Sequence, residues 1–507
     1  MASHKSSIAA LGLALVLGQD ALAGAPATGP ARWITTWYAA PQPGWDSGFA
    51  LPMNVPVSLG QQSVRERLRV SAGGQRIRIV LSNRYGRQPL RVGGVRVGLA
   101  HGAGPALPLT FSGQAAVSIA PGADATSDPV ALAVPPLARL EVTSYLPAST
   151  PVTSFHWGAQ QTLAIEAGDT LGAQAATQAE RIGGRLFTAA VLVEAAAGSR
   201  TVVALGDSIT DGNGSTPDTD RRWPDALAER LRPYGIGVAN AGISGARLLR
   251  DGMGQSALAR FQQDVLGQPG VTDVIVLLGI NDIGWPGSPF ATAESQVTLE
   301  ELAAGYRQLL AAAHVRGVRM TVGTLPPFEG ALEGTPYAGH YSPTKERLRV
   351  RLNDWIRSAG IFDAVVDFDA VLRDPAHPRR LRPEVDSGDH LHPGDAGYRA
   401  MAAAIDIAPL MQGASAAGRR GLAQPRYSGC SIPATSTANA STLPLCGYCA
   451  SSSFERPLLA LVTNSVRRSG PPKQTAVGQR SGRSICCSSS PVGDSLSRRP
   501  PSYIATQ

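Results

Sequence analysis

The first 412 of the 507 residues contain no cysteine, and the five cysteines of the chain all lie beyond residue 429. This long stretch therefore has no disulfide framework, no thiolate metal site and no cysteine nucleophile. The late cysteines are odd in number and have no histidines beside them, so Cys446-x-x-Cys449 is a weak zinc signature. We expect no metal and no cofactor.

The net charge of the first 412 residues is also close to zero. Of the 46 Lys and Arg and 38 Asp and Glu residues, 11 basic and 2 acidic ones lie from Gly413 onward, which leaves 35 and 36 in the first 412 residues. The basicity thus belongs to the C-terminal segment, which lacks interleaved aromatic residues. We expect no nucleic-acid partner. With 43% of its residues hydrophobic, the chain can bury a sizeable core.

No segment after the N-terminus is apolar for the roughly 20 residues that a membrane span needs. Residues 1–23 resemble a secretory signal peptide: Lys5 precedes the apolar stretch Ile8–Gly18, and Ala21-Leu22-Ala23 is a small-x-small cleavage site. The alternative is a buried N-terminal helix. We expect a protein that is secreted, extracellular or periplasmic, after cleavage near Ala23.

Residues 413–507 lack any helix or strand periodicity and are rich in Ser, Arg, Pro and Gly. This composition predicts a disordered basic tail. Translation in a shifted frame is an alternative origin for a segment so unlike the rest of the chain.

Residues 30–195 have the short, alternating apolar segments of an all-β, sandwich-like accessory domain. Val64–Val70 and Arg76–Leu81 flank Gly73-Gly74 and are predicted to form a hairpin. Further strands are expected at Leu90–Leu99, Ala116–Ile119, Leu137–Leu146 and Pro151–Trp157.

We find no acid/base pair or ligand cluster in this β-rich region. Its aromatic residues could stack on a sugar ring, but packing in the core or at a domain interface is the favoured interpretation. These residues are Trp33, Trp37, Tyr38 and Trp45.

Residues 196–412 alternate strands with helices, which predicts an α/β fold with a parallel sheet covered on both faces. Amphipathic helices are expected at Leu299–His314 and Pro343–Ser358. Active sites in such folds lie beyond the carboxyl ends of the strands. The expected strands are Thr201–Leu205, Ile236–Asn240, Asp273–Leu278, Met320–Leu325 and Ala364–Phe368.

The loop after the first of these strands is Gly206-Asp207-Ser208-Ile209. The glycine permits a sharp turn that brings the Ser208 hydroxyl to the sheet edge, where its N–H is free to bind a developing negative charge. The alternative is an ordinary helix cap.

The next two strands are followed by loops with further donors. Gly245 offers a backbone N–H that no Cβ shields, and Asn281 offers an uncharged side-chain donor. In each loop taken alone, the glycine or asparagine could serve only to form the turn.

The last loop, Asp386-Ser387-Gly388-Asp389-His390-Leu391-His392-Pro393, combines imidazoles with carboxylates. Asp389 precedes His392 by three residues, which lets one loop hold both. A metal site is the alternative interpretation of His-x-His between aspartates, although no third protein ligand is evident.

Taken together, these four loops resemble the motifs of the SGNH/GDSL hydrolase family over residues 200–410, in the family's order. A glycine is common in the family where His390 stands, and the Asp-x-x-His spacing with the following proline favours His392. The β-rich region resembles the leading region of some secreted bacterial members.

The resemblance implies a flavodoxin-like three-layer α/β/α domain at 196–412 and a serine esterase. Ser208 would be the nucleophile, His392 the general base and Asp389 its partner, with an oxyanion hole of Ser208, Gly245 and Asn281. Asp207, Asp211 and Asp282 are expected to bind loop backbone.

Short-acyl or O-acetyl esters are the favoured substrates. The alternatives are a lipase or acyltransferase acting on lipid esters, and a catalytically inactive carbohydrate-binding protein on the same scaffold. No Gly-x-Gly-x-x-Gly follows a strand, which disfavours an oxidoreductase. The oligomeric state stays open.

Overall fold

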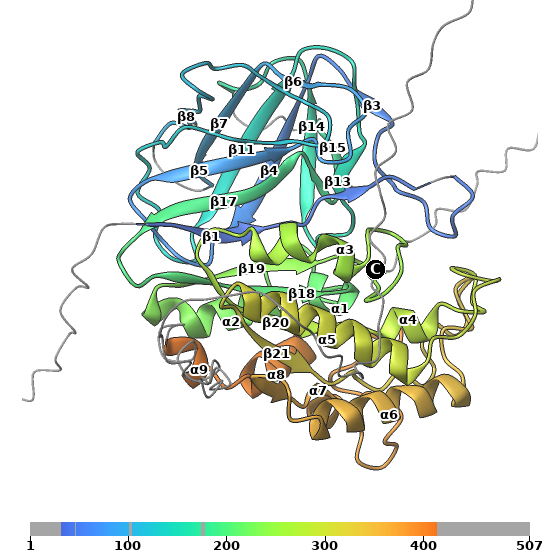
Figure 1. Ribbon diagram of the computed structural model, residues 1–507. Coiled ribbons are helices and arrows are strands. Elements are labelled where there is room, and N and C mark those ends of the chain that lie inside the picture. Colours follow the sequence, from blue (N-terminus) through green and yellow to red (C-terminus); the bar gives the residue numbers. More distant parts are fainter. Residues whose placement is uncertain (1–31, 46, 101–103, 174–177, 413–507) are drawn as a thin grey trace, which may run out of the picture. The chain divides into compact units, whose positions relative to one another are not determined.

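The computed structural model describes residues 32–412, apart from residue 46 and the segments 101–103 and 174–177 (Figure 1). The predicted signal peptide and the predicted basic tail lie outside the described residues. Within the described part of the chain, no helix is both long and apolar enough to cross a bilayer.

The β-rich region holds two larger antiparallel sheets (Figure 1). One has the order β1 (Arg32–Tyr38), β17 (Thr188–Ala195), β5 (Ile77–Ser82) and β10 (Asp124–Thr126). The other has the order β15 (Glu180–Gly183), β14 (Thr162–Ala167), β4 (Gln62–Arg69), β11 (Arg139–Leu146), β7 (Gly94–Leu99) and β8 (Leu107–Pro108). Short pairings add β2 (Gln42–Pro43), β13 (Ser154–His156), β16 (Arg185–Leu186), β3 (Ser58–Leu59), β12 (Thr150–Pro151), β6 (Leu90–Val92) and β9 (Val117–Ile119).

The two larger sheets share one apolar core. In β5 the side chains of Ile77, Ile79 and Leu81 are fully buried, whereas those between them are partly exposed. They belong to the same buried cluster as Val64 and Leu68 of β4. This alternation is the period of two that places every second side chain of a strand on the core face.

The predicted hairpin between the segments around Val64 and Arg76 is wrong. β4 pairs with β11 and β14, whereas β5 pairs with β17 and β10 in the other sheet. The Gly73-Gly74 segment crosses between the sheets, and a Cβ at Gly74 would lie 2.5 Å from the carbonyl oxygen of Glu194. The glycines thus serve close backbone packing, not a tight turn.

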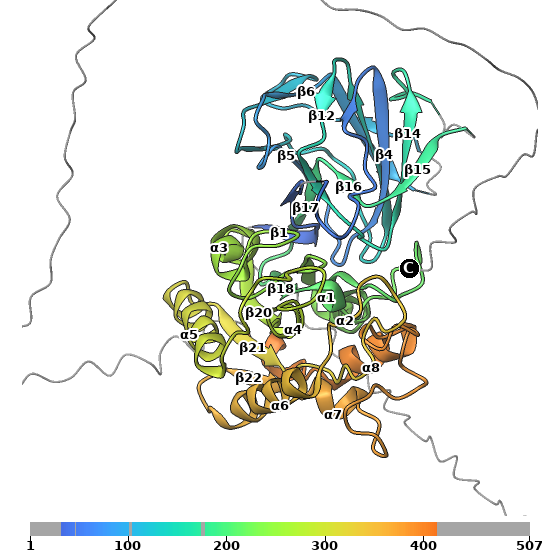
Figure 2. The ribbon, with the colours of Figure 1, turned by 90° about the vertical axis from the view of Figure 1, so that its right-hand side faces the viewer.

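The second region holds a parallel sheet of the order β19 (Ile236–Gly242), β18 (Arg200–Gly206), β20 (Val271–Leu277), β21 (Arg319–Gly323) and β22 (Ala364–Val366). Numbered along the chain this is 2-1-3-4-5, the flavodoxin-like order. Helices α3 and α5 cover one face, and α2 and α8 the other (Figure 2). The predicted α/β/α fold is confirmed.

The helices of this region are α1 (Ser208–Asp211), α2 (Trp223–Leu231), α3 (Ala257–Phe261), α4 (Ile280–Gly284), α5 (Leu299–Val315), α6 (Pro343–Ser358), α7 (Phe368–Leu372), α8 (Asp395–Ala404) and α9 (Ala408–Met411). Single turns η1 (Arg232–Tyr234) and η2 (Gln262–Leu266) follow α2 and α3. The fifth strand is shorter than predicted, because Asp367 caps α7 by accepting from the N–H of Ala370 and Phe368 is therefore helical.

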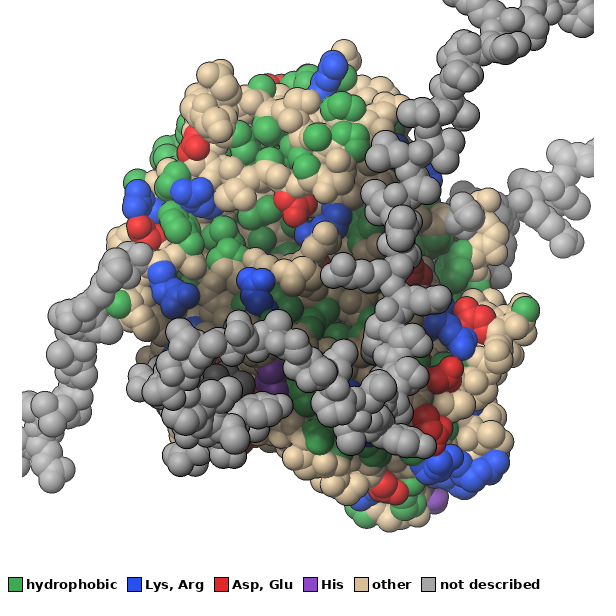
Figure 3. Space-filling view, in the orientation of Figure 1, with side chains coloured by type: hydrophobic (Ala, Val, Ile, Leu, Met, Phe, Trp, Pro, Cys, Tyr) green, Lys and Arg blue, Asp and Glu red, His purple; other side chains and the backbone are tan. Residues whose placement is uncertain are grey.

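The β-rich region contacts the parallel sheet through β1. A parallel bridge joins Ala39 to Asn240 of β19, and the Thr35 N–H donates to the carbonyl of Pro269 over 2.9 Å. Trp37 and Tyr38 are buried, and the Tyr38 hydroxyl donates to Asp264 Oδ1 over 2.7 Å. These two aromatic residues therefore have the packing role that the sequence favoured. On the face shown in Figure 3, acidic and basic side chains are interspersed.

Candidate active site

Ser208 begins a short helix directly at the carboxyl end of the central strand β18. The Asp207 side chain caps this helix by accepting from the N–H of Ile209 over 3.0 Å. Because the first N–H groups of a helix have no partner within it, the Ser208 N–H is available to a ligand. Ser208 itself is 6% exposed.

His392 joins the serine to a carboxylate. Its Nε2 lies 2.8 Å from Ser208 Oγ and its Nδ1 lies 2.5 Å from Asp389 Oδ2. Since an ionised carboxylate can accept but not donate, the proton sits on Nδ1 and Nε2 accepts from the serine hydroxyl. The other oxygen of Asp389 accepts from the N–H groups of Leu391 and His392, which fixes the carboxylate within its loop.

The electrostatics of the pair suit proton transfer. Burial alone would lower the pKa of His392, but the charge of Asp389 and the hydrogen bond to it raise that pKa above its ordinary value. Burial alone would raise the pKa of Asp389, but His392 and two backbone N–H groups lower it below the ordinary value. The carboxylate therefore stays ionised while the imidazole can gain a proton.

Two further donors lie at the same pocket. Gly245 has φ of +71°, and a Cβ there would lie 2.6 Å from the sulfur of Met253 and 2.8 Å from Cζ2 of Trp285, so glycine is required. Asn281 of α4 is 3% exposed, and its Nδ2 donates to the carbonyl of Ala246 over 3.1 Å. The second N–H of this amide remains for a ligand.

Ser208, Gly245, Asn281, Asp389 and His392 line one pocket. His390 has a different environment: its Nδ1 lies 2.5 Å from Asp386 Oδ2, and its side chain is 54% exposed. Its φ of +60° is in the left-handed region, which favours glycine and is uncommon for other residues. Among the described residues, no three His, Cys, Asp or Glu side chains gather as a metal site would require.

The three remaining aspartates of the motifs differ from one another. Asp282 accepts from the N–H groups of Leu248 and Leu249 over 2.7 and 3.0 Å, as expected. Asp207 caps α1, and burial raises its pKa to about 7. Asp211 departs from the expectation, because its carboxylate binds side chains: Nε2 of His156 at 3.0 Å and Oγ of Ser244 at 2.8 Å.

Residues 204–400 match the sequence profile of the GDSL-like lipase/acylhydrolase family. This segment is a GDSL domain.

The match supports a hydrolase that acts on esters. No curated protein matches the chain. Solved structures similar to it include a GDSL-like lipase from Bacteroides thetaiotaomicron, with 20% identity, a TM-score of 0.30 and coverage of 42% of this chain and 87% of that one. A variant of Axe2, an acetyl xylan esterase from Geobacillus stearothermophilus, has 26% identity, a TM-score of 0.29 and coverage of 40% and 92%.

The pocket of the GDSL domain has an aromatic wall that the sequence did not reveal. Trp285 stacks on Phe290 with ring centroids 5.1 Å apart, and Phe290 stacks on Tyr337 at 5.4 Å. Trp285 follows Asn281 by one helical turn, and this spacing was the feature of the sequence that could have placed its ring beside the pocket. The other apolar residues of the pocket are Leu51, Trp157, Met253, Leu332 and Leu391.

His340 also lines this pocket and was not identified from the sequence. It is 1% exposed, and neither ring nitrogen has a hydrogen-bond partner among the described residues. Burial, reinforced by the nearby charge of Lys345, lowers its pKa to about 3. The imidazole is therefore neutral at physiological pH.

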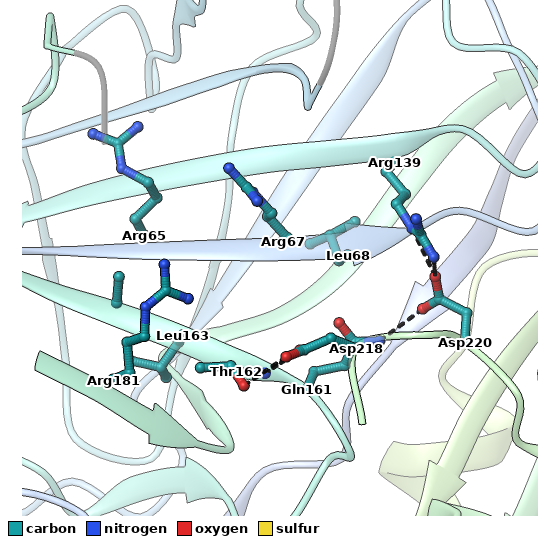
Figure 4. Close-up of a pocket in the computed structure, with 11 residues that line it drawn as sticks. Arg65, Arg67, Leu68, Arg139, Gln161, Thr162, Leu163, Arg181, Asp218 and Asp220 are labelled. Carbon is teal, nitrogen blue, oxygen red and sulfur yellow. Dashed lines mark hydrogen bonds and ion pairs between the residues drawn. The ribbon is translucent and has the colours of Figure 1, made fainter. Parts of the chain in front are cut away.

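A second pocket lies in the β-rich region, where it meets residues 218–220 of the GDSL domain (Figure 4). Its charges are largely paired: Asp220 accepts from Arg139 and Gln161, and Asp218 accepts from Thr162. Its lining includes neither serine nor histidine. A serine and a histidine within hydrogen-bonding distance of each other therefore line the first pocket and not this one.

Proposed function

We propose that the protein is a secreted serine esterase that cleaves carboxylic esters through an acyl-enzyme. The observation that carries this proposal is the continuous chain of hydrogen bonds from Asp389 through His392 to Ser208 Oγ. These hydrogen bonds lie at the carboxyl end of the central strand, where proteins with parallel sheets bind their substrates. The signal peptide predicted from the sequence supports secretion.

In the proposed reaction, Ser208 Oγ attacks the ester carbonyl carbon while His392 Nε2 takes the hydroxyl proton. The tetrahedral intermediate collapses when the alcohol leaves with that proton, and the acyl group stays on Ser208. Water then attacks the acyl-enzyme while His392 takes a proton from it. When the second tetrahedral state collapses, His392 returns that proton to Ser208 Oγ and the acid departs. Asp389 keeps the imidazole in the required tautomer and stabilises its cation.

The carbonyl oxygen becomes negatively charged in both tetrahedral states. We assign its stabilisation to the N–H groups of Ser208 and Gly245 and the free side-chain N–H of Asn281. All three residues line the pocket that holds the reacting hydroxyl. This arrangement needs no metal ion to polarise the carbonyl.

Short-acyl and O-acetyl esters are the first substrate candidates. A second candidate, an ester with a longer apolar acyl or aryl part, is favoured by one observation. Apart from the proposed catalytic groups and His340, most of the pocket lining is aromatic or aliphatic, including Trp285, Phe290 and Leu332. An apolar wall binds hydrocarbon through the hydrophobic effect and offers few hydrogen bonds to sugar hydroxyls.

Hydrolysis of p-nitrophenyl acetate, butyrate and palmitate by the full chain and its Ser208→Ala variant tests the proposal. We expect the wild type to cleave at least one of them and the folded variant to be inactive. The chain-length profile then separates the two substrate candidates. A folded wild type that cleaves no p-nitrophenyl ester and releases no acetate from acetylated polysaccharide would contradict the proposal and favour a binding protein.

A further inference from the structure

A histidine of the β-rich region contacts the helix that carries the proposed nucleophile. His156, the last residue of β13, is 4% exposed. Its Nε2 lies 3.0 Å from Asp211 Oδ1, and its Nδ1 lies 2.9 Å from the carbonyl oxygen of Ala40. Asp211 ends α1, three residues after Ser208. The two regions therefore meet at the helix that begins with Ser208.

The contact joins His156 to two oxygen atoms, the carbonyl oxygen of Ala40 and Oδ1 of Asp211. A carbonyl oxygen and a carboxylate are both acceptors, so a neutral imidazole could donate to one of them only. Both contacts are hydrogen bonds when one proton lies on Nδ1 and a second proton, carried by either group, lies between Nε2 and Asp211 Oδ1. Removing either side chain leaves the other buried without its hydrogen bond, which destabilises the contact.

Asp211 also contacts the loop that contains Gly245, the predicted oxyanion donor. Its second oxygen accepts from Ser244 Oγ over 2.8 Å, and Ser244 is 2% exposed. Ser244 immediately precedes Gly245, whose N–H is a proposed donor to the oxyanion. One carboxylate thus links the helix of Ser208 to the loop of Gly245.

A second contact from the β-rich region holds the other side of this loop. Gln42 accepts from the N–H of Trp157 over 2.9 Å and donates to the carbonyl of Met253 over 2.6 Å. Met253 in turn packs against Gly245, where an added Cβ would meet its sulfur at 2.6 Å. The loop of Gly245 is therefore held between two contacts that both originate in the β-rich region.

We propose that His156 is a positioning residue of the ester-hydrolysing site, acting through Asp211 and Ser244 on the N–H of Gly245. The β-rich region then completes the active site and is more than a detachable accessory domain. This inference rests on the proposed function. Preorganised donors lose their effect when they are misaligned, so the loss of His156 should slow the chemical step more than it weakens substrate binding.

The test compares kcat and KM of the full chain with those of His156→Gln, on the best p-nitrophenyl ester. We expect kcat to fall by about 10- to 100-fold, less than for deletion of a whole oxyanion donor, and KM to stay within about threefold. A trifluoromethyl ketone, which forms a tetrahedral adduct, should bind more weakly in proportion to kcat. Tyr38→Phe is the matched control: it removes another buried hydrogen bond between the same two regions. It should lower Tm and leave kcat unchanged.

Two further variants make the result specific. Ser244→Ala removes the hydrogen bond between Asp211 and the loop of Gly245 and leaves the His156–Asp211 contact in place. It should reproduce the fall in kcat, even where His156→Gln fails to fold. The double variant His156→Gln with Asp211→Asn places two amides that can hydrogen-bond to each other at this contact and should recover part of the kcat that Asp211→Asn loses. Wild-type kcat in Ser244→Ala, or a change confined to Tm or KM in folded His156→Gln, overturns the inference. A wild type inactive on every ester overturns the proposed function instead.

Discussion

His340 should make the stability of the fold depend on pH. Both of its ring nitrogens are buried without a partner among the described residues, and its ring packs edge-on against Phe328 at 6.1 Å. Its pKa is lowered to about 3 by burial and by the charge of Lys345. An unperturbed histidine, as in the unfolded chain, has a pKa of about 6.5. The folded and unfolded states therefore bind protons at this residue at different pH values.

The sign and size of the effect follow from proton linkage. Above about pH 6.5 the imidazole is neutral in both states, and His340 contributes no pH dependence. Between about pH 6.5 and about pH 3 the unfolded chain binds a proton that the folded protein does not, so stability falls as the pH is lowered. Each pH unit is worth about 1.36 kcal/mol, which gives about 2.7 kcal/mol between pH 6.5 and 4.5.

Urea unfolding of the wild type and of His340→Leu at pH 7.5, 5.5 and 4.5 measures this contribution. At pH 7.5 the variant should be as stable as the wild type or more so, because it removes two unsatisfied polar atoms. Its stability relative to the wild type should then rise by about 2.7 kcal/mol by pH 4.5. His377→Leu, which removes a largely exposed imidazole, controls for the loss of one histidine. A stability difference that is the same at all three pH values would refute the reasoning.

Three predictions concern the proposed reaction. Asn281→Ala should fold and lose about 10²–10³ in kcat because one oxyanion donor is gone; a near-wild-type rate in an ester assay would remove Asn281 from the site. The pH profile of kcat/KM should have an acid limb with a midpoint above about 6.5, because Asp389 raises the pKa of His392 and only the neutral imidazole is a base. Asp389→Asn should move that midpoint to lower pH and reduce kcat by about 10⁴, and an unchanged profile would contradict the assignment. His392→Ala should abolish ester cleavage whereas His390→Ala should retain it, and the reverse result would exchange their roles.

The motifs of the GDSL domain could be found from the sequence because each lies in a short loop whose position the parallel sheet dictates. Ser208 follows the first strand of that sheet, Asn281 follows the third, and the spacing of Asp389 and His392 lets one loop hold both. In a parallel sheet the carboxyl ends of neighbouring strands meet at one edge. Residues far apart in the sequence could therefore be predicted to lie close together from the strand order alone, without any other long-range contact.

The β-rich region was predicted less well, for a physical reason. An antiparallel sheet admits many pairings of the same alternating strands, and the two segments beside Gly73-Gly74 satisfy the hairpin pattern equally well. The choice was decided by contacts that no local pattern encodes, such as the close approach of Gly74 to Glu194. Short-range signals identified the strands, and tertiary packing distributed them between two sheets.

The same distinction explains why His156 was overlooked. Nothing near it in the sequence resembles an acid/base pair, because its partner Asp211 is 55 residues further along the chain and in the other region. Asp211 was expected to hydrogen-bond to the loop backbone for a similar reason, because no side chain close to it in the sequence is an evident partner. The sequence suggests a clear boundary between an accessory domain and a catalytic domain. If Ser244→Ala lowers kcat as expected, the β-rich region contributes to catalysis in spite of that boundary. A GDSL domain expressed without the β-rich region should then lack an intact oxyanion loop even where its triad residues are all present.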